Sequence, residues 1–432
     1  MKPLRFPSRT FLHKSVAVTL LALSGVASAG RPAVAGAVAD TVVLDWNLIA
    51  VQAVGATPPF PSTRAVASVQ LAVFDAVNAI TQRFQPYLGG LSAPAGASAQ
   101  AAVVAAAHDV LAWLFPAQLS FLDLKQAESL ATIADGDGKI AGMAVGRAAA
   151  AAIIASRTND GAQTPMFYAP TSSDPYEWQP TPTCASAPAN GRGLFFHWQF
   201  VKPFGVAGAS QFRAEPPPVI TGGKYAIDFN EVATLGAVGS TLRTEQQANA
   251  VRLFGGSPPH RGWNLVARQL AGARADEITQ TARTLALLNM SLADGHITIF
   301  ESKYHYRGWR PETAIQRAAD DGNDKTAAGT FQPFIPAPCF PGYPSAHGIG
   351  GGAARTILWR AYGRKQHDIT LSDAAVPGIV VRYNDLLDIT DDVTIARVAG
   401  GIHFRIDQDV ADRMGADIAR YNLERWLLPV VK

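Results

Sequence analysis

Lysine, arginine and histidine residues occur beside turn signals in the last third of the chain. In the first of three clusters, Lys303 and Arg310 are separated by seven positions, and Pro311 follows. Because proline disfavours a helical conformation in the residue before it, we expect a helix to end before Arg310. A guanidinium at such a chain break can bind the oxygens of a tetrahedral anion. Taken alone, the cluster is more typical of a solvated basic surface.

The second cluster is Pro344-Ser345-Ala346-His347, after a proline- and glycine-rich turn and before a helical run. Ser345 is a natural N-cap, so the free backbone N–H groups of the helix would point outward beside it. An anion could bind there to the Ser345 hydroxyl and the Ala346 N–H, with His347 placed for proton transfer. The alternative is a capping serine beside a buried histidine.

The third cluster contains Arg397, His403 and Asp407, with Gly400 and Gly401 between the arginine and the histidine. The glycines allow the backbone to approach a ligand closely. We expect His403 in the first turn of the last helix, whose positive end favours a neutral imidazole. Asp407 lies one helical turn further on and could hold the ring. The alternative is a core histidine with a structural ion pair.

The elements that position these clusters are predicted to be helices. Residues 62–80 place apolar side chains at three-to-four spacing on one stripe, and alanine-rich stretches follow. Alternating strand patterns are scarce, which predicts an all-α helical bundle. The expected helices are 62–80, 101–115, 140–156, 228–254, 263–270, 278–300, 348–362 and 402–427.

Residues 158–225 differ in composition from the rest of the chain. This stretch is rich in proline and aromatic residues. Helix interiors exclude proline, and so many aromatic side chains are unusual in a free linker. We therefore expect an ordered irregular segment that wraps the bundle near the mouth of a site.

The first 29 residues have the pattern of a secretory signal. Four basic residues precede an apolar run, and small residues end the segment at Ala29, where we expect cleavage. The apolar run is well short of the roughly 20 residues that span a bilayer. The formal charge of +3 becomes 3 − 4 = −1 without the segment, so the basic balance indicates neither nucleic acid nor membrane as a partner. We expect an exported protein in which Cys184 and Cys339 either pair or remain buried thiols.

Together the three clusters resemble the vanadium-dependent haloperoxidases and type-2 phosphatidate phosphatases. The signature of that superfamily is Lys-x6-Arg-Pro, then Pro-Ser-Gly-His, then Ser-Arg-x5-His-x3-Asp. The internal spacings match from Lys303 to Pro311, from Pro344 to His347 and from Arg397 to Asp407. Ala346 replaces the glycine, and Ala396 replaces the serine before Arg397.

Further upstream, short motifs resemble the secreted bacterial haloperoxidase-like branch. They are Phe74 to Ile80, Trp178 to Pro182, Lys202 to Phe204, Arg243 to Gln246 and Leu292 to Asp294. The resemblance therefore implies one all-α domain over residues 30–432, with the active site in residues 294–427.

The resemblance also implies a role for each site residue. His403 is similar to the histidine that is bonded to vanadium, or phosphorylated in the phosphatases, and His347 is similar to the acid–base histidine. Asp407 is similar to the carboxylate that positions the essential histidine. The expected cofactor is vanadate, and phosphate could occupy the same site. Its oxyanion-binding residues would be Lys303, Arg310, Ser345, Ala346 and Arg397.

The predicted function is vanadate-dependent oxidation of a halide by hydrogen peroxide, which gives a hypohalous species that halogenates a small organic acceptor. The alternatives are an exported acid phosphatase with a phosphohistidine intermediate and an anion-binding protein without turnover. The paired histidines argue against pure binding, which needs neither acid nor base. The sequence leaves open the halide, the organic acceptor and the oligomeric state.

Two aromatic residues bear on the halide. Phe340 resembles the chloroperoxidase branch, whereas Phe300 replaces a tryptophan of the fungal chloroperoxidases. We expect both rings to form a pocket wall, with ordinary core packing as the alternative. This combination predicts bromide or iodide oxidation and leaves chloride open. His108, His260, His296, His305 and His367 have no ligand spacing and are expected to be structural or exposed. Asp294 is expected either to support the cation cluster or to pack helices.

Overall fold

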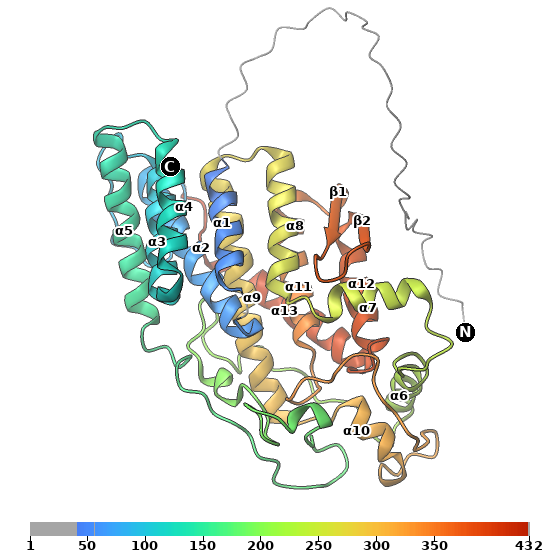
Figure 1. Cartoon of the computed structure of the whole chain (residues 1–432). Helices are drawn as coiled ribbons and strands as arrows, with labels where there is room; N and C mark the ends of the chain where they lie inside the picture. Colours follow the sequence, from blue (N-terminus) through green and yellow to red (C-terminus); the bar gives the residue numbers. More distant parts are fainter. Residues whose placement is uncertain (1–40, 56, 431–432) are drawn as a thin grey trace, which may run out of the picture.

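The computed structural model describes residues 41–55 and 57–430 (Figure 1). The predicted signal segment, residues 1–29, lies outside the described residues. The helices are α1 (Val42–Ala53), α2 (Pro59–Thr81), α3 (Ala99–Leu114), α4 (Leu119–Ala131), α5 (Asp137–Arg157), α6 (Gly223–Leu235), α7 (Glu245–Gly255), α8 (Pro259–Arg274), α9 (Ile278–Tyr306), α10 (Pro311–Gln316), α11 (Ala346–Tyr362), α12 (Leu386–Val398) and α13 (Arg405–Arg425). The strands are β1 (Lys365–Ser372) and β2 (Val380–Asp385). The fold is helical, as the sequence predicts.

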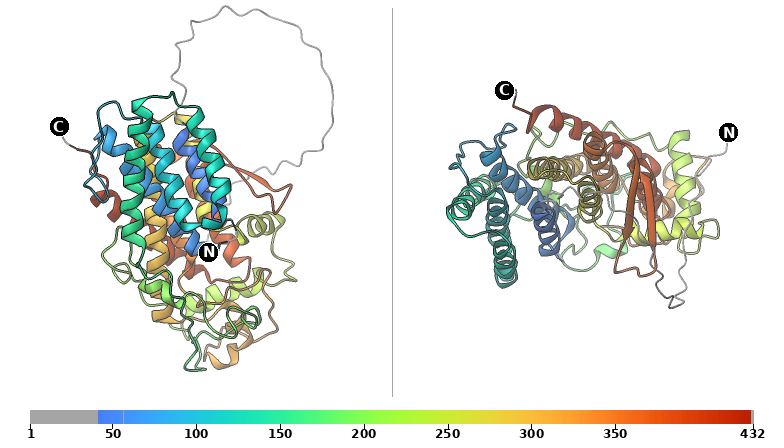
Figure 2. Two further views of the ribbon diagram at one scale, coloured as in Figure 1. Left: turned by 60° about the vertical axis from the view of Figure 1, so that its left-hand side comes forward. Right: turned by 90° about the horizontal axis from the view of Figure 1, so that it is seen from above.

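The N-terminal helices form one side of the molecule. Helices α3 and α5 pack together, and both contact α2 (Figure 2). Small buried side chains such as Ala102, Ala106, Ala149 and Ala150 allow the two alanine-rich helices to approach closely. Helix α5 is long and apolar enough to cross a membrane by composition, but one of its faces is buried against this bundle.

Helix α9 runs through the middle of the molecule and joins the two halves. It contacts α2 on one side and both α11 and α13 on the other (Figures 1 and 2). Helices α11 and α13 pack so closely that a Cβ atom added to Gly352 would lie 2.0 Å from the Asp412 carbonyl oxygen. A Cβ atom added to Gly415 would lie 2.1 Å from the Ile349 carbonyl oxygen. Glycine at these positions therefore permits the backbone contact that brings the second and third clusters together.

The proline- and aromatic-rich stretch is irregular from Thr158 to Gly222, with short 3-10 turns at Pro182–Cys184 and Phe196–Phe200. It ends at Gly222, three residues before the predicted boundary at residue 225, because α6 begins at Gly223. Asp160 anchors its start through an ion pair with Arg64, with a nitrogen–oxygen distance of 2.6 Å. A disulfide joins Cys184 to Cys339 and so decides between the two alternatives left open for these cysteines.

Asp294 secures the same segment to α9. Its carboxylate accepts hydrogen bonds from the backbone N–H groups of Phe204 and Gly205, at 2.7 and 2.9 Å, and from the Asn422 amide at 3.1 Å. Asp294 is fully buried. Of the two expected roles, the structure supports packing: Asp294 holds the irregular segment and α13 against α9.

Two predictions about elements are wrong. The expected helix 228–254 is divided into α6 and α7, because Arg243 donates to the carbonyl oxygens of Leu235, the last residue of α6, and of Ala237, and because Thr244 starts α7 with a capping box. The last expected helix begins at Arg405 instead of residue 402, so His403 precedes it. The sequence analysis also missed the antiparallel hairpin β1–β2, whose buried Ile369, Leu371, Val381 and Tyr383 side chains join the core.

Candidate active site

Three cationic side chains from separate elements come together in a group that we call the cation cluster: Lys303, Arg310 and Arg397. Lys303 lies in the last turn of α9, Arg310 is the N-cap of α10, and Arg397 lies in the last turn of α12. Lys303 and Arg310 are fully buried, and Arg397 is only 3% exposed. Helix α9 ends at Tyr306, so Arg310 does lie at a chain break. Their burial excludes the alternative of a solvated basic surface.

The Lys303 ammonium is held by two backbone oxygens. Its Nζ donates to the carbonyl oxygens of Pro341 and Gly342, at 2.8 and 2.7 Å. The ammonium also lies 5.3 Å from the centre of the Phe340 ring. Burial, together with the positive charge of Arg310, lowers the pKa of Lys303 well below its usual range. A bound anion would therefore stabilise the charged form of this lysine.

Arg310 is oriented by three acceptors and keeps one free donor. Its Nε donates to the Phe340 carbonyl oxygen at 2.9 Å, and one terminal nitrogen donates to the Ile402 carbonyl oxygen at 2.9 Å and to His403 Nε2 at 3.0 Å. Its other terminal nitrogen has no hydrogen-bond partner among the described residues. Burial lowers the pKa of Arg310 to about 9. A buried unpaired donor on a cation favours an anionic ligand.

Arg397 completes the cation cluster. It donates to the Gly255 carbonyl oxygen at 3.1 Å, while its Nε lacks a partner within the described chain. Burial lowers the pKa of Arg397 to about 10. Lys303, Arg310 and Arg397 can carry three positive charges, whereas Asp407 supplies one negative charge. An oxyanion would offset this imbalance and satisfy the free N–H groups.

His403 is held between Asp407 and Arg310. Its Nδ1 lies 2.8 Å from the Asp407 carboxylate, and its Nε2 accepts from Arg310. A carboxylate accepts and a guanidinium donates, so the proton is assigned to Nδ1 and the lone pair to Nε2. Burial and the nearby positive charge of Arg310 lower the pKa of His403 well below its usual range. The ring is thus a neutral base or ligand, although it precedes α13 instead of lying in its first turn.

The second cluster is located beside the other two. Ser345 is the N-cap of α11, and its hydroxyl accepts from the Gly348 N–H at 3.3 Å. The Ser345 N–H donates to the Asp407 carbonyl oxygen at 2.9 Å, which fixes α11 against the start of α13. His347 is partly exposed, and its Nε2 lies 3.3 Å from the Ser257 carbonyl oxygen. Burial of most of the ring and the charge of Arg397 lower the pKa of His347.

A cavity of about 240 Å³ opens beside the second and third clusters, and Lys303, Arg310 and Ser345 are not among its lining residues. Arg397, His403, His347 and Ala346 line it, and Phe340 forms part of its wall. For Phe300 the structure supports the alternative of core packing, because this fully buried ring is not among the residues that line the cavity. It packs behind the wall, with ring centres 4.5 Å from Phe60 and 5.3 Å from Phe340.

The sequence analysis missed two rings of this wall, Phe60 at the start of α2 and Phe195 from the irregular segment. Their ring centres are 4.9 Å apart. No motif or residue spacing in the sequence points to either ring, because the two come from distant parts of the chain. The dense aromatic composition of residues 158–225 was the one available hint, and Phe195 confirms that this segment reaches the site.

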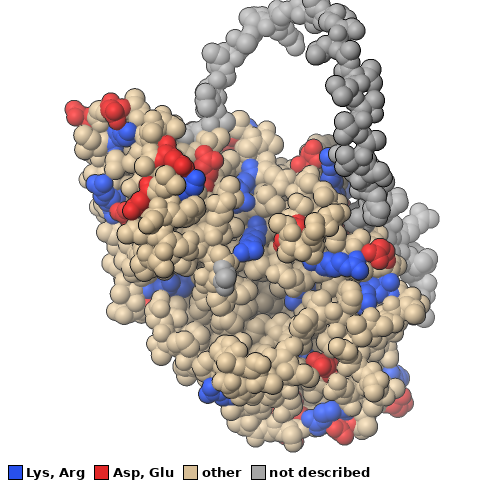
Figure 3. Space-filling view, in the orientation of Figure 1, with Lys and Arg blue, Asp and Glu red and all other residues tan. Residues whose placement is uncertain are grey.

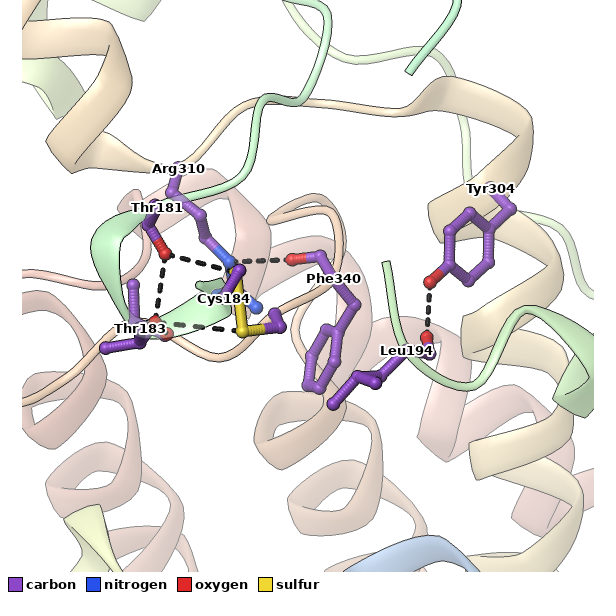
Figure 4. Close-up of a disulfide and its surroundings, with 9 residues drawn as sticks. Thr181, Thr183, Cys184, Leu194, Tyr304, Arg310 and Phe340 are labelled. Carbon is purple, nitrogen blue, oxygen red and sulfur yellow. Dashed lines mark hydrogen bonds between the residues drawn. A yellow bond between two sulfur atoms is a disulfide. The ribbon is translucent and has the colours of Figure 1, made fainter. Parts of the chain in front are cut away.

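The disulfide lies next to the cation cluster. Figure 4 shows Cys184 beside Arg310, whose Nε points toward the Phe340 carbonyl oxygen. Thr183 donates to the carbonyl oxygen of Ala337, two residues before Cys339 in the chain, at 2.6 Å. The irregular segment therefore fixes the short stretch that supplies both the Phe340 ring and its carbonyl oxygen.

Comparison with known proteins finds similarity to vanadium haloperoxidases. The family described as the VCPO second helical-bundle domain matches residues 283–428, which include all three clusters. Vanadium chloroperoxidase of Curvularia inaequalis is 23% identical in a match 285 residues long that covers 50% of this chain and 46% of that relative. In sequence and fold, the chain is similar to the vanadium haloperoxidase superfamily. It matches slightly less than half the length of this curated relative.

Solved structures of vanadium haloperoxidases share the fold. The structure described as the first bacterial vanadium-dependent iodoperoxidase has a TM-score of 0.74 and 21% identity, covering 91% of this chain and 97% of that one. A bacterial vanadium-dependent chloroperoxidase in its apo form has a TM-score of 0.67 and 19% identity, covering 84% and 92%. The superfamily fold thus extends over both bundles and the irregular segment.

Proposed function

We propose that the protein oxidises a halide with hydrogen peroxide on bound vanadate. The observation that carries the proposal is the buried neutral His403, whose unprotonated Nε2 accepts from Arg310, while Arg310 and Arg397 each keep an unpaired nitrogen donor. This arrangement offers one ligand nitrogen and several N–H groups to a single anion. The descriptions of the iodoperoxidase and chloroperoxidase structures support the same chemistry.

The residues present fit vanadate. His403 Nε2 would bind the vanadium, and Lys303, Arg310 and Arg397 would bind the oxygens, with Ser345 and the Ala346 N–H as further donors. Vanadate supplies a Lewis acid that activates peroxide without a change in its own oxidation state. Asp407 holds the proton on Nδ1, so Nε2 is unprotonated, and the metal would replace the hydrogen bond that Nε2 accepts from Arg310.

His347 is the residue we assign to proton transfer. It lines the same cavity as Arg397 and His403, and its lowered pKa leaves the ring neutral and so able to accept a proton near neutral pH. The overall reaction consumes one halide, one peroxide and one proton and gives hypohalous acid and water. The peroxide is reduced by two electrons and the halide is oxidised by two.

The halide we propose is bromide or iodide. The cavity wall contains the Phe340, Phe60 and Phe195 rings, which exclude water from one side. A dry wall strengthens the field of the cations on a bound oxyanion. Bromide and iodide are more easily oxidised than chloride, so we leave chloride to the experiment.

The test is an assay of the purified protein with peroxide and each halide, with and without vanadate. We expect vanadate-dependent oxidation of bromide or iodide. In Arg397→Ala the rate should fall at least about a hundredfold, the scale for losing one donor to the reacting anion. The matched control is Arg252→Ala, an exposed arginine paired with Glu245, which should retain the wild-type rate. Failure to oxidise any halide would refute the proposal.

The acid phosphatase alternative rests on the same nitrogen. A neutral imidazole with a free Nε2 is also the nucleophile that a phosphohistidine intermediate requires, with His347 as the acid for the leaving group. Hydrolysis of a phosphate monoester that vanadate inhibits, without halide oxidation, would establish it. Binding of phosphate or vanadate without either turnover would establish an anion-binding protein.

We also propose that the protein is exported. The basic and apolar pattern of the first 29 residues and the Cys184–Cys339 disulfide both suit an oxidising compartment. On the face seen in Figure 3, acidic and basic side chains are interspersed, which fits a protein without nucleic acid as a partner. N-terminal sequencing of protein recovered outside the cytoplasm should begin near Gly30, and detection of Met1 would contradict the cleavage.

A further inference from the structure

A second cavity adjoins the anion site on the other side of His347. Its volume is about 240 Å³, and it shares Ser257, Pro258, Pro259 and His347 with the first cavity. The elements around it are α1, the end of α7, α8, α12 and the end of β1. Apart from His347, no residue of the three clusters lines this cavity.

The floor of the second cavity is apolar. The side chains that form it belong to elements far apart in the sequence: Val51, Leu253, Phe254, Trp263, Leu265, Leu371, Ile389 and Val393. Trp263 is only 4% exposed, so its indole is a firmly packed wall. The volume lies just below the range of about 300–1,000 Å³ typical of small-molecule sites, which favours an occupant with a single ring.

The polar groups of this cavity favour a negative charge. Arg261 and Arg268 line it from α8, and Asp373 lines it beside β1. Arg261 donates to the Gly55 carbonyl oxygen at 2.8 Å, and Arg268 donates to Asn47 Oδ1 at 2.6 Å. In the part of the chain that the structure describes, neither arginine forms an ion pair with a carboxylate. The Asp373 carboxylate instead accepts from the Ala375 N–H at 2.9 Å.

We propose that this second cavity binds the organic acceptor, a one-ring aromatic molecule with an anionic group, next to His347. The inference rests on the proposed function and names the substrate class of that reaction. Hypohalous acid formed in the first cavity would meet the ring across His347. There a carbon–hydrogen bond is replaced by a carbon–halogen bond, and the displaced proton combines with the hydroxide of the hypohalous acid to give water. The oxidising equivalents come from the peroxide already consumed.

Gly262 provides a variant that fills the cavity without disturbing the fold. It lines the cavity, and a Cβ atom added to it would have no heavy atom within 4 Å. It lies inside α8, where replacing glycine with leucine should stabilise the helix by up to about 1 kcal/mol. The matched control is Gly272→Leu, an exposed position of the same helix. Thermal melting of both variants checks that they remain folded.

The binding experiment uses 4-hydroxybenzoate and isothermal titration calorimetry, with phenol and the cationic tyramine for comparison. We expect 4-hydroxybenzoate to bind more tightly than phenol and tyramine to bind least. Gly262→Leu should weaken 4-hydroxybenzoate at least about tenfold by steric exclusion, and Gly272→Leu should not. Arg261→Gln should weaken 4-hydroxybenzoate several-fold and leave phenol unchanged. No binding to the wild type, or equal binding to Gly262→Leu, would overturn the proposal.

A kinetic measurement separates this inference from the proposed function. Formation of triiodide from iodide and peroxide needs no acceptor, so Gly262→Leu should retain it while losing saturable halogenation of 4-hydroxybenzoate. Equal halogenation by the variant would show that hypohalous acid reacts only after diffusing away, and would refute the acceptor site. If the wild type forms no triiodide but binds 4-hydroxybenzoate at this cavity, the proposed function fails and the binding site remains.

Discussion

At the scale of single residues, the candidate site depends on contacts between side chains that lie close together in the chain, such as His403 and Asp407. The interval between His403 and Asp407 is short enough to be fixed by one turn of backbone, and the two side chains do form a hydrogen bond. The interval between Lys303 and Arg310 likewise predicted the chain break between α9 and α10. The position of Phe195 could not be predicted, because its place in the wall depends on how a long irregular segment returns to α2.

The Asp407 carboxylate sets the proton position on His403, and this leads to our first prediction. In Asp407→Asn, the amide can present an N–H group toward Nδ1, which moves the ring proton to Nε2 and removes the lone pair that faces the cations. We expect vanadate affinity to fall about 10- to 100-fold, the usual effect of losing such a supporting partner. Equilibrium dialysis with vanadate measures it.

The matched control for that experiment is Asp409→Asn, two residues along α13 and outside the contacts of His403. It should bind vanadate as the wild type does. Unchanged affinity in Asp407→Asn would show that the carboxylate does not orient the ligand histidine.

His260 is a buried histidine outside the site and leads to the second prediction. It is 1% exposed, and neither ring nitrogen has a hydrogen-bond partner among the described residues. Burial lowers its pKa to about 3, from a usual value of 6.5. The stability that the neutral ring contributes is therefore present above pH 6.5 and is lost as the pH falls toward 3. His260→Leu should remove this acid sensitivity.

The measurement is urea unfolding of the wild type and His260→Leu between pH 7.5 and pH 4. Each unit below 6.5 should widen the difference in the free energy of unfolding by about 1.4 kcal/mol in favour of the variant. His305→Leu, at an exposed position on α9, is the control. A difference that is constant with pH would contradict the depressed pKa.

At the scale of elements, local sequence patterns predicted the helices whose apolar residues recur at helical spacing. They missed the element boundaries that tertiary contacts determine. The helix over residues 62–80 is predicted nearly as it occurs, since one apolar stripe identifies it, whereas α9 continues six residues beyond the predicted 278–300. The break between α6 and α7 depends on Arg243 reaching the carbonyl oxygens at the end of α6, which is a contact outside any helical period. The hairpin β1–β2 has only two short strands, and its alternation is too brief to stand out.

The connection between α9 and the irregular segment leads to the third prediction. Asp294 accepts three hydrogen bonds in a fully buried place, so Asp294→Ala leaves the Phe204 and Gly205 N–H groups unpaired. We expect the free energy of unfolding to fall by about 2–4 kcal/mol, roughly one unsatisfied-donor penalty for each N–H group. Chemical denaturation measures it.

Limited proteolysis should also show faster cleavage within residues 158–222 of Asp294→Ala, because the segment loses its attachment to α9. Asp320→Ala removes an exposed carboxylate that pairs with Arg317 and serves as the control. Wild-type stability in Asp294→Ala would mean that other contacts hold the segment.

At the scale of the whole molecule, the irregular segment links the surface to the site. It contacts α2, α9 and the stretch before α11, and it supplies Phe195 to the cavity wall. The sequence predicted that the segment is ordered but not which faces it covers, because proline and aromatic content indicate neither direction nor contacts. The Cys184–Cys339 disulfide attaches the segment covalently and closes a loop of 155 residues that includes α9.

That closure leads to the last prediction, which concerns the molecule in its compartment. The two cysteines of the chain are both in the disulfide, so the exported protein should titrate no thiol when unfolded and two after reduction. The double variant Cys184→Ser with Cys339→Ser should lose about 2–4 kcal/mol in the free energy of unfolding, since the loop is long. Because Cys339 precedes Phe340, whose carbonyl oxygen accepts from Arg310, the variant should also bind phosphate more weakly. Urea unfolding and calorimetry with phosphate measure the two effects, and a variant that matches the wild type in both would show that packing alone holds the segment in place.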